Sequence, residues 1–213
     1  MDVRAERPED RDAVRDIHLR AFGTNRSGQG NAQGKAVADL VDTLRSSLDR
    51  TTGASLIAAQ NREAERNQDG EAVPEPEAEQ ESQVIGHIMF TRALLDAPRR
   101  LVEVQVLSPL AVLPAYQRKG IGAALVRAGL RTMTTLGVPL VFLEGSPRYY
   151  PRFGFAPGDE SGFRKPSLRI PDAAFQVIRL PTYQPWMTGT LVYPQAFWDL
   201  DLVGLRQDED ASR

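Results

Sequence analysis

A short loop that combines glycines with cations is the segment of this chain best suited to binding an anion. It reads Gln117-Arg-Lys-Gly-Ile-Gly122 and stands where a segment with helical periodicity begins. The first N–H groups of a helix lack partners within the helix, and they point outward with the positive end of its dipole. Glycine leaves room for a phosphate to approach them. The loop therefore predicts a phosphate-binding turn, with a glycine-rich turn and solvated cations as the simpler alternative.

Two common nucleotide-binding motifs can be compared with this loop. The P-loop pattern is absent, because no Lys in the chain follows Gly and precedes Ser or Thr. A dinucleotide-binding fingerprint needs a small residue at its third glycine position, where this chain has Leu125. Glu144, at the end of the next predicted strand, could still serve as a ribose-binding acid. A Rossmann-like nucleotide domain therefore stays open as an alternative.

Two further segments accompany the loop. Residues 149–155 read Tyr-Tyr-Pro-Arg-Phe-Gly-Phe, and residues 108–114 read Ser-Pro-Leu-Ala-Val-Leu-Pro. Gln117, Gly120 and Gly122 match the short signature Q/R-x-x-G-x-G/A. Together these features resemble the GNAT superfamily of acyl-CoA-dependent N-acetyltransferases, and within it a group described as predicted N-acetyltransferases. The resemblance covers most of the chain and implies an α/β fold with a mixed, mostly antiparallel central sheet and helices on both faces.

The resemblance also implies a binding site for acetyl-CoA in two parts. In GNAT folds the strand before the loop splays away from its neighbour, and the pantetheine arm pairs with the exposed backbone. Ser108–Pro109 is the expected place of the distortion, because proline removes a hydrogen-bond donor from the strand and indicates a bulge. The expected pantetheine contacts are Leu110, Ala111 and Val112, and the expected diphosphate contacts are Gln117, Arg118, Lys119, Gly120, Ile121 and Gly122.

The catalytic groups follow from the same resemblance. Tyr150 matches the tyrosine that protonates the departing thiolate, and a backbone N–H near the pantetheine contacts is the expected oxyanion donor. Some members carry a base glutamate in the strand before the loop, where this chain has Val106. The nearby carboxylates, Glu103 and Glu144, are the remaining candidates for a general base, with a solvated or ion-paired role as the alternative.

These residues predict direct transfer of an acetyl group from acetyl-CoA to a primary amine in a ternary complex. The chain has no cysteine, so an acyl-cysteine intermediate is excluded. A non-catalytic CoA-binding sensor is the alternative function, because the strand glutamate is missing. The acceptor, a small-molecule or peptide amine, is expected to bind near the Gly23–Gly34 loop and the region of Tyr183 and Trp186.

The elements that must position these groups follow from hydrophobic periodicity. Apolar residues recur at helical spacing in residues 8–22, 35–48 and 121–136. His18, beside the apolar stripe of the first helix, is expected to be packed and hydrogen-bonded rather than a metal ligand. Alternating or continuous apolar segments predict strands, which are expected at 54–59, 84–91, 101–107, 110–112, 138–143, 153–155, 175–180 and 189–193.

Two acidic segments interrupt or follow these elements. Residues 60–83 hold eight acids against two arginines and few apolar residues, so they cannot bury enough surface to offset the entropy of ordering. We expect a disordered insertion there and a frayed acidic tail at 199–213, which leaves residues 1–198 as a single domain. Residues 84–198 carry 13 cations against 6 acids, and this field suits the phosphates of CoA.

The overall composition excludes several classes of protein. The 213 residues carry 26 Lys and Arg against 28 Asp and Glu, and this near-neutral balance argues against general nucleic-acid binding. No apolar run approaches the ~18 residues of a membrane helix. Without cysteine and with two histidines, disulfides and thiolate zinc sites are excluded, and no metal is expected. A reducing cytoplasm is the default location, and the choice between a monomer and a homodimer stays open.

Overall fold

The computed structural model describes residues 1–23, 30–46, 48, 51, 53–61 and 82–205 of the chain. Its helices are α1 (Arg11–Phe22), α2 (Gly30–Ser46), α3 (Ile121–Thr135) and α4 (Gln195–Asp199). The short 3-10 helices are η1 (Pro8–Asp10), η2 (Pro114–Tyr116), η3 (Tyr150–Phe153), η4 (Asp159–Ser161) and η5 (Asp172–Ala174). The strands are β1 (Asp2–Ala5), β2 (Ala54–Asn61), β3 (Ser82–Asp96), β4 (Leu101–Val112), β5 (Leu140–Glu144), β6 (Ala156–Pro157), β7 (Phe163–Arg164), β8 (Phe175–Arg179) and β9 (Gly189–Val192).

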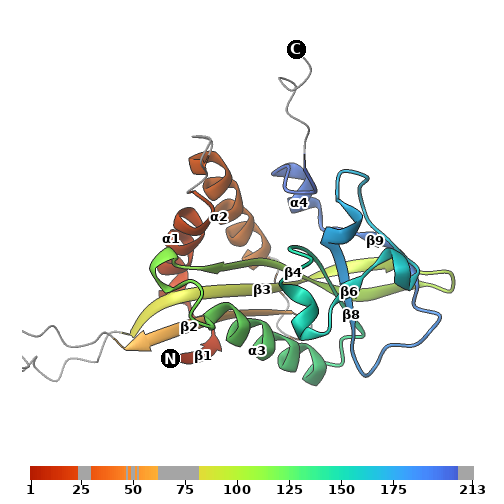
Figure 1. The fold of residues 1–213 in the computed structure, drawn as a ribbon, viewed down its shortest axis with the longest axis horizontal. Coiled ribbons are helices and arrows are strands. Elements are labelled where there is room, and N and C mark those ends of the chain that lie inside the picture. Colours follow the sequence, from red (N-terminus) through yellow and green to blue (C-terminus); the bar gives the residue numbers. More distant parts are fainter. Residues whose placement is uncertain (24–29, 47, 49–50, 52, 62–81, 206–213) are drawn as a thin grey trace, which may run out of the picture.

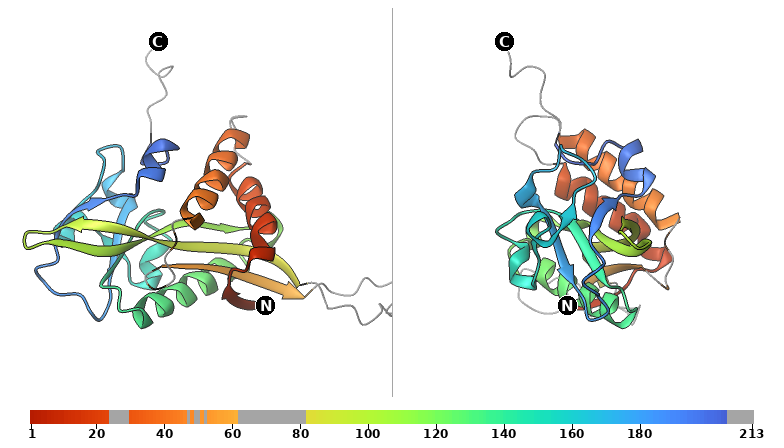
Figure 2. Two further views of the ribbon diagram at one scale, coloured as in Figure 1. Left: turned by 180° about the vertical axis from the view of Figure 1, so that it is seen from behind. Right: turned by 90° about the vertical axis from the view of Figure 1, so that its right-hand side faces the viewer.

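The strands form one mixed sheet in which most neighbours are antiparallel. The order along the main path is β1-β2-β3-β4-β5-β8-β6, while β9 pairs with the end of β3 and with β7. Within the described residues the parallel pairs are β4–β5 and β7–β9. Helices α1 and α2 lie on one face of the sheet and α3 lies on the other (Figure 1), and the views from behind and from the side show the same layers (Figure 2). The predicted fold class is confirmed.

The apolar stripes of the helices face the sheet, as their periodicity predicts. Val14 and Ile17 of α1 and Leu125 of α3 are completely buried. Gly129 brings α3 close to the strands, because a Cβ on this residue would lie only 2.1 Å from the ring of Phe90 in β3. The helix can therefore rest on an aromatic ring of the sheet, and its first residue is held at a fixed place beside β4.

Two strand expectations are corrected by the structure. The strand β1 was not predicted, because four residues that alternate charged and small side chains carry little hydrophobic signal; the strand forms by pairing with β2. Residues 153–155, predicted to be a strand, instead contain a turn in which Gly154 has a φ of 95°. The strand β6 begins after this turn, at Ala156, where it pairs with β8.

The ordered structure also extends into both acidic segments. The hairpin of β2 and β3 continues until Asn61 pairs with Ser82, so the outer residues of the predicted insertion are strand. Residues 62–81, for which disorder was predicted, lie outside the described residues. In the predicted tail, α4 includes Asp199, and Val203 is completely buried. The apolar residues at 200, 202 and 203 explain this packing, which the net charge of the segment does not predict. Residues 206–213 lie outside the described part.

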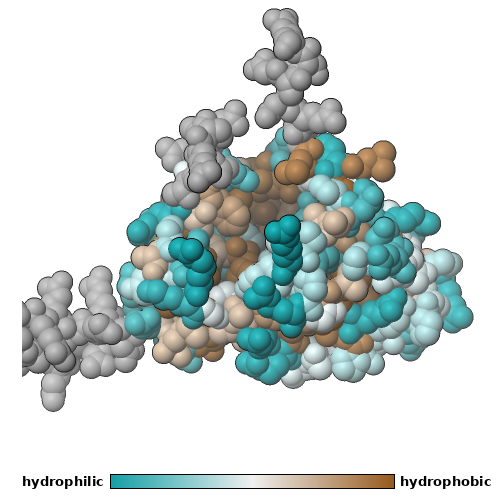
Figure 3. All heavy atoms as spheres, in the orientation of Figure 1, coloured by the Kyte–Doolittle hydropathy of each residue, from teal (hydrophilic) through white to brown (hydrophobic). Residues whose placement is uncertain are grey.

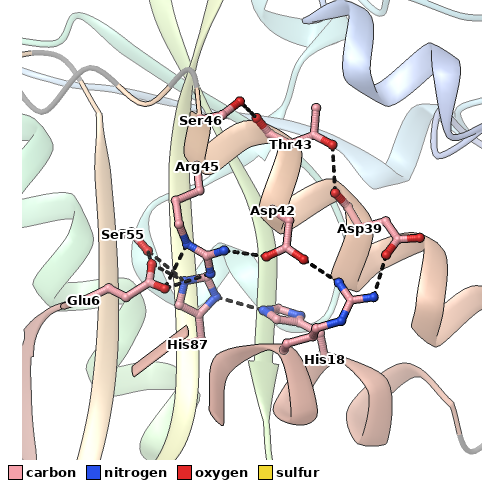
Figure 4. Close-up of polar contacts among 10 residues, drawn as sticks. Glu6, His18, Asp39, Asp42, Thr43, Arg45, Ser46, Ser55 and His87 are labelled. Carbon is pink, nitrogen blue, oxygen red and sulfur yellow. Dashed lines mark hydrogen bonds and ion pairs between the residues drawn. The ribbon is translucent and has the colours of Figure 1, made fainter. Parts of the chain in front are cut away.

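A buried polar network joins α1 and α2 to the first strands (Figure 4). His18 Nε2 lies 2.8 Å from His87 Nδ1, and His87 Nε2 lies 2.8 Å from the Ser55 hydroxyl. Ser55 also donates to Glu6, whose other oxygen accepts from the Arg45 guanidinium at 2.7 Å. The prediction that His18 is packed and hydrogen-bonded is confirmed, and its partner is the second histidine of the chain.

The chemistry of Glu6 fixes the protons of this network. Burial alone would raise the pKa of Glu6, but contacts with His87, Ser55 and Arg45 lower it to about 2, so the carboxylate is charged and accepts from Ser55. The Ser55 oxygen then accepts from His87 Nε2–H, and His87 Nδ1 accepts from His18 Nε2–H. This leaves His18 Nδ1 without a proton, and among the described residues it has no hydrogen-bond partner. Both imidazoles are neutral in this arrangement.

Candidate active site

Strand β4 separates from β5 partway along its length. Their parallel pairing ends at Val106 and Phe142, whereas β4 continues beside β3 to Val112. Near this point the β3–β4 register shifts, so that Ser108–Pro109 stand opposite a single residue of β3. The predicted bulge is confirmed, and its physical reason is the missing donor of proline. Among the described strands, none pairs with this edge of β4 beyond Val106.

The free edge of β4 presents main-chain hydrogen-bonding groups. The N–H of Leu113 donates to the carbonyl of Ile85 in the β3 segment, at 2.9 Å. Hydrogen-bonded and non-hydrogen-bonded pairs alternate along an antiparallel ladder, so Leu110 and Val112 turn their N–H and C=O groups away from β3. Ala111, between them, turns its own groups toward β3. Two of the three predicted pantetheine contacts therefore offer main-chain groups at the open edge.

The loop that follows β4 ends in a left-handed turn at the start of α3. Gly120 caps the helix with a φ of 86°, and Arg118 has a φ of 61°. The N–H of Ala124 donates to the carbonyl of Gly120 at 3.0 Å, so the N–H groups of residues 121–123 belong to the open first turn of the helix. Donors and helix dipole thus favour an anion at this position.

Gly122 connects this anion-binding turn to the free edge of β4. A Cβ on Gly122 would lie 2.9 Å from the Tyr149 hydroxyl and 3.8–3.9 Å from side-chain atoms of Val112 and Leu110. The absence of a side chain therefore lets the start of α3 lie close to the strand edge and to Tyr149.

The remaining residues predicted to bind the cofactor surround the same turn. The Gln117 side-chain amide donates to the carbonyl of Val112 at 3.0 Å, which fastens the loop to the strand end. Arg118 and Lys119 are exposed, and the Lys119 ammonium lies 5.3 Å from the centre of the Tyr116 ring. Ile121 is buried and anchors the first turn of α3. The structure thus brings the predicted cofactor residues together at one end of β4.

A cleft of about 480 Å³ lies beside the free edge of β4. Its walls come from β4, the segment after β5, helices α1 and α2, and the segment after β9. Figure 3 shows a hollow with apolar walls between the positions of α2 and α4. The lining groups able to take part in proton transfer or hydrogen bonding include Glu144, Tyr149, Tyr150, Tyr193, Ser108 and Ser146.

Tyr150 lies in this cleft at the start of η3. Its ring packs against Gly145, where a Cβ would approach the Tyr150 Cε2 atom to 2.3 Å, and against the ring of Tyr149 at 5.0 Å. Burial raises the pKa of the Tyr150 phenol, and the neighbouring Tyr149 adds to this effect. The hydroxyl is therefore protonated at neutral pH and available as a donor.

Glu144 lies in the same cleft at the end of β5. Its carboxylate accepts from the N–H of Gly204 at 3.0 Å and from the hydroxyl of Tyr193. Burial raises the pKa of Glu144, although Tyr193, Gly204 and the charge of Arg169 oppose the shift. A half-buried carboxylate with a raised pKa can accept a proton from a bound group.

Other residues considered from the sequence lie elsewhere. Glu103 pairs with Arg92 at 2.7 Å, near the opposite end of β4, and it does not line the cleft. Trp186 lies beside Arg99 and Arg100 at the far end of the sheet. The centre of its ring is 5.4 Å from the guanidinium carbon of Arg99 and 5.6 Å from that of Arg100. Of the two candidate carboxylates, the structure therefore brings only Glu144 next to Tyr150.

The structure adds residues that the sequence pattern did not single out. Tyr193 and Phe197, which follow β9, line the cleft, and so does Phe22 at the end of α1. No spacing rule connects these positions to Glu144, because they meet only after β9 has paired with the end of β3. The one signal available was the cluster of aromatic residues at 193–198, which could be identified only as core.

Comparisons with known proteins agree with this geometry. The family model described as an acetyltransferase (GNAT) domain matches residues 2–158. The uncharacterized N-acetyltransferase YjhQ of Escherichia coli is 30% identical over 154 residues, which cover 72% of this chain and 68% of the relative. The crystal structure of the E. coli GNAT family N-acetyltransferase YhbS in complex with CoA aligns with a TM-score of 0.67 and 26% identity, covering 92% of this chain and 90% of the other. A GNAT family acetyltransferase from Brucella melitensis in complex with acetyl-CoA aligns with a TM-score of 0.62 and 28% identity, covering 92% and 97%.

The chain belongs to the GNAT superfamily of N-acetyltransferases. The superfamily that the sequence resemblance predicted is thereby confirmed. The Rossmann-like alternative is wrong, because that fold requires a mostly parallel sheet. In the part of the chain that the structure describes, no helix has the length and apolar character to cross a membrane.

Proposed function

We propose that this protein transfers an acetyl group from acetyl-CoA to a primary amine by direct attack within a ternary complex. One observation carries the proposal: the free edge of β4, Tyr150 and Glu144 border one cleft, and Gly122 in the open first turn of α3 lies beside Leu110 and Tyr149 of that cleft. The site thus combines an extended anion-binding surface with a proton donor and a proton acceptor. Acyl transfer from a thioester to an amine requires these groups.

The residues at the strand edge and the helix start fit acetyl-CoA. The diphosphate suits the open N–H groups of residues 121–123, with Arg118 and Lys119 adding screened attraction. The pantetheine amides suit the outward-facing main-chain groups of Leu110 and the N–H of Val112, whose carbonyl accepts from Gln117. The two structural neighbours with CoA and acetyl-CoA bound support the same assignment, because they share this fold over more than nine tenths of the chain.

Glu144 is the proposed general base. An amine must lose its proton before it attacks, and the raised pKa of the Glu144 carboxyl makes it a better acceptor than a solvated carboxylate. Its two donors, Tyr193 and Gly204, hold the carboxylate in place. The main-chain N–H of Leu110 is the proposed donor to the oxyanion that forms on the acetyl carbonyl.

Tyr150 is the proposed acid for the departing thiolate. Because burial keeps the phenol protonated, it can donate a hydrogen bond to the sulfur as the carbon–sulfur bond breaks. Its position next to Glu144 in one cleft favours catalysis over a CoA-binding sensor, for which neither group is needed. A cytoplasmic location and the choice between a small-molecule and a peptide amine stay predictions.

Free-thiol release tests this function. With acetyl-CoA and a panel of amines, we expect thiol release that depends on the amine, and a fall in turnover for Tyr150→Phe with little change in acetyl-CoA affinity by calorimetry. Tight CoA binding without thiol release on any amine would instead favour the sensor. A Tyr150→Phe variant with unchanged turnover would remove Tyr150 from the mechanism.

A further inference from the structure

The acceptor side of the cleft has a distinctive chemical character. Five aromatic rings line the cleft, and they come from the end of α1, the segment after β5 and the segment after β9. They belong to Phe22, Tyr149, Tyr150, Tyr193 and Phe197. The rings of Tyr193 and Phe197 pack at 5.0 Å between centres, and Phe22 lies parallel to His18 at 6.0 Å, so their positions are fixed by neighbours.

The charge on these walls is equally specific. Among the lining residues that the structure describes, Glu144 is the one carboxylate, and no Lys or Arg is present. Two cations outside the lining have other partners: Arg169 pairs with Asp201 at 3.1 Å, and Arg152 lies over the Tyr149 ring at 4.9 Å. The described cleft therefore offers one negative group inside an apolar, aromatic surround.

We propose, on the basis of the proposed function, that the acceptor is a small primary monoamine on an aromatic body without a carboxylate or phosphate. Aromatic side chains favour a flat apolar group through edge and stacking contacts, and they also attract an ammonium ion through their ring faces. Glu144 accounts for the single positive charge. The cleft volume of about 480 Å³ lies within the range of small-molecule sites, roughly 300–1,000 Å³.

Two other common classes of amine fit these walls poorly. An amino acid would bring its carboxylate into a cleft whose described walls hold no cation and already hold Glu144. A polyamine would bring additional ammonium groups that have no further carboxylate to meet. Moving an unpaired charge out of water is unfavourable, so each mismatch corresponds to a loss of at least about 100-fold in kcat/KM.

A set of matched amines tests the inference. Thiol release from acetyl-CoA is measured with 2-phenylethylamine, with phenylalanine, with spermidine and with a short peptide that begins with phenylalanine. We expect 2-phenylethylamine to have a kcat/KM at least about 100-fold above those of phenylalanine and spermidine, and above that of the peptide. The inference would be overturned if phenylalanine, spermidine or the peptide were the best acceptor, while acetyl transfer itself would stand. No thiol release with any amine would contradict the proposed function itself, and the inference with it.

A pair of variants tests whether the aromatic walls recognise the ring. In Phe22→Leu the wall stays apolar but loses its ring, and we expect the preference for 2-phenylethylamine over n-hexylamine to fall by about five- to tenfold, mainly through KM. Trp186→Leu removes a ring at the far end of the sheet and should leave this preference unchanged. Equal preferences in Phe22→Leu and the unmodified protein would overturn the role of the rings.

Discussion

The two buried histidines predict a fold that loses stability in mild acid. Burial lowers the pKa of His18 well below its ordinary value, with further lowering by His87 and Arg45, and burial likewise lowers the pKa of His87. In the unfolded chain both imidazoles return to a pKa near 6.5. The unfolded state therefore binds more protons than the native state as the pH falls through this value. The contribution of the two histidines to stability is therefore complete above a pH of about 6.5 and decreases below it.

The magnitude follows from proton linkage. Histidines that stay neutral in the fold reduce the free energy of unfolding by at most about 1.2 kcal/mol each, or about 2.5 kcal/mol for the pair, when the pH is lowered from 7.0 to 5.5. These are the only histidines in the chain, and cysteine is absent. Carboxylates of ordinary pKa titrate below this range, so the window reports mainly on the buried pair.

Urea denaturation at several pH values between 5.5 and 7.0 measures the effect. We expect the unfolding free energy to fall across the range, by at most about 2.5 kcal/mol, and to fall less in His18→Gln, which keeps a donor but does not titrate. The raised pKa of Glu144 has the opposite effect, because a carboxyl that binds its proton more tightly in the native state stabilises the fold as the pH falls. Repeating the measurement in Glu144→Gln removes this contribution. Stability that is constant or rises toward pH 5.5 would refute the neutral, buried histidine pair.

Four further predictions concern the site. Gly120→Ala and Gly137→Ala each place a Cβ in open space at a positive φ, 86° and 72°, so each variant should lose about 1–2 kcal/mol of stability. Calorimetry should show acetyl-CoA binding weakened by about tenfold in Gly120→Ala and unchanged in Gly137→Ala. Equal affinities in the two variants would argue against the α3 turn as the phosphate site. Gly145→Ala forces the Tyr150 ring to move. Thiol-release assays should then show turnover reduced by about 100-fold, as in Tyr150→Phe. Glu144→Gln should lower kcat/KM by about 100-fold or more. It should also remove from the pH–rate profile the acid limb that the raised Glu144 pKa, above its ordinary 4.5, produces. An unchanged acid limb would exclude Glu144 as the base. Tyr193→Phe removes a donor to Glu144, so the same acid limb should move to higher pH with little change in acetyl-CoA affinity.

The cofactor half of the site could be predicted from the sequence because it is local. The bulge at Ser108–Pro109, the glycine turn and the start of α3 lie within one short stretch, and each follows from a property of proline, glycine or a helix end. The periodicity of the helices likewise predicted which faces are buried. These features depend on neighbours in the chain and not on the rest of the fold.

The acceptor half could not be predicted in the same way. Tyr193 and Gly204 reach Glu144 only through the tertiary path of β9 and α4, and no spacing in the sequence encodes that meeting. The same limit applies to His18 and His87, which come from a helix and a strand far apart in the chain and form one hydrogen bond. Net charge also gave a wrong expectation for the acidic tail, which contains Leu202, a residue that lines the cleft.

Mass analysis of the amine after reaction with acetyl-CoA tests the central claim most directly. We expect each free thiol released to be matched by one amine that has gained a single acetyl group, with both quantities falling together in Tyr150→Phe. This result would establish transfer of the acetyl group to the amine at the cleft between β4 and β5. Thiol release without an acetylated amine, or equal product formation by the variant, would contradict the account.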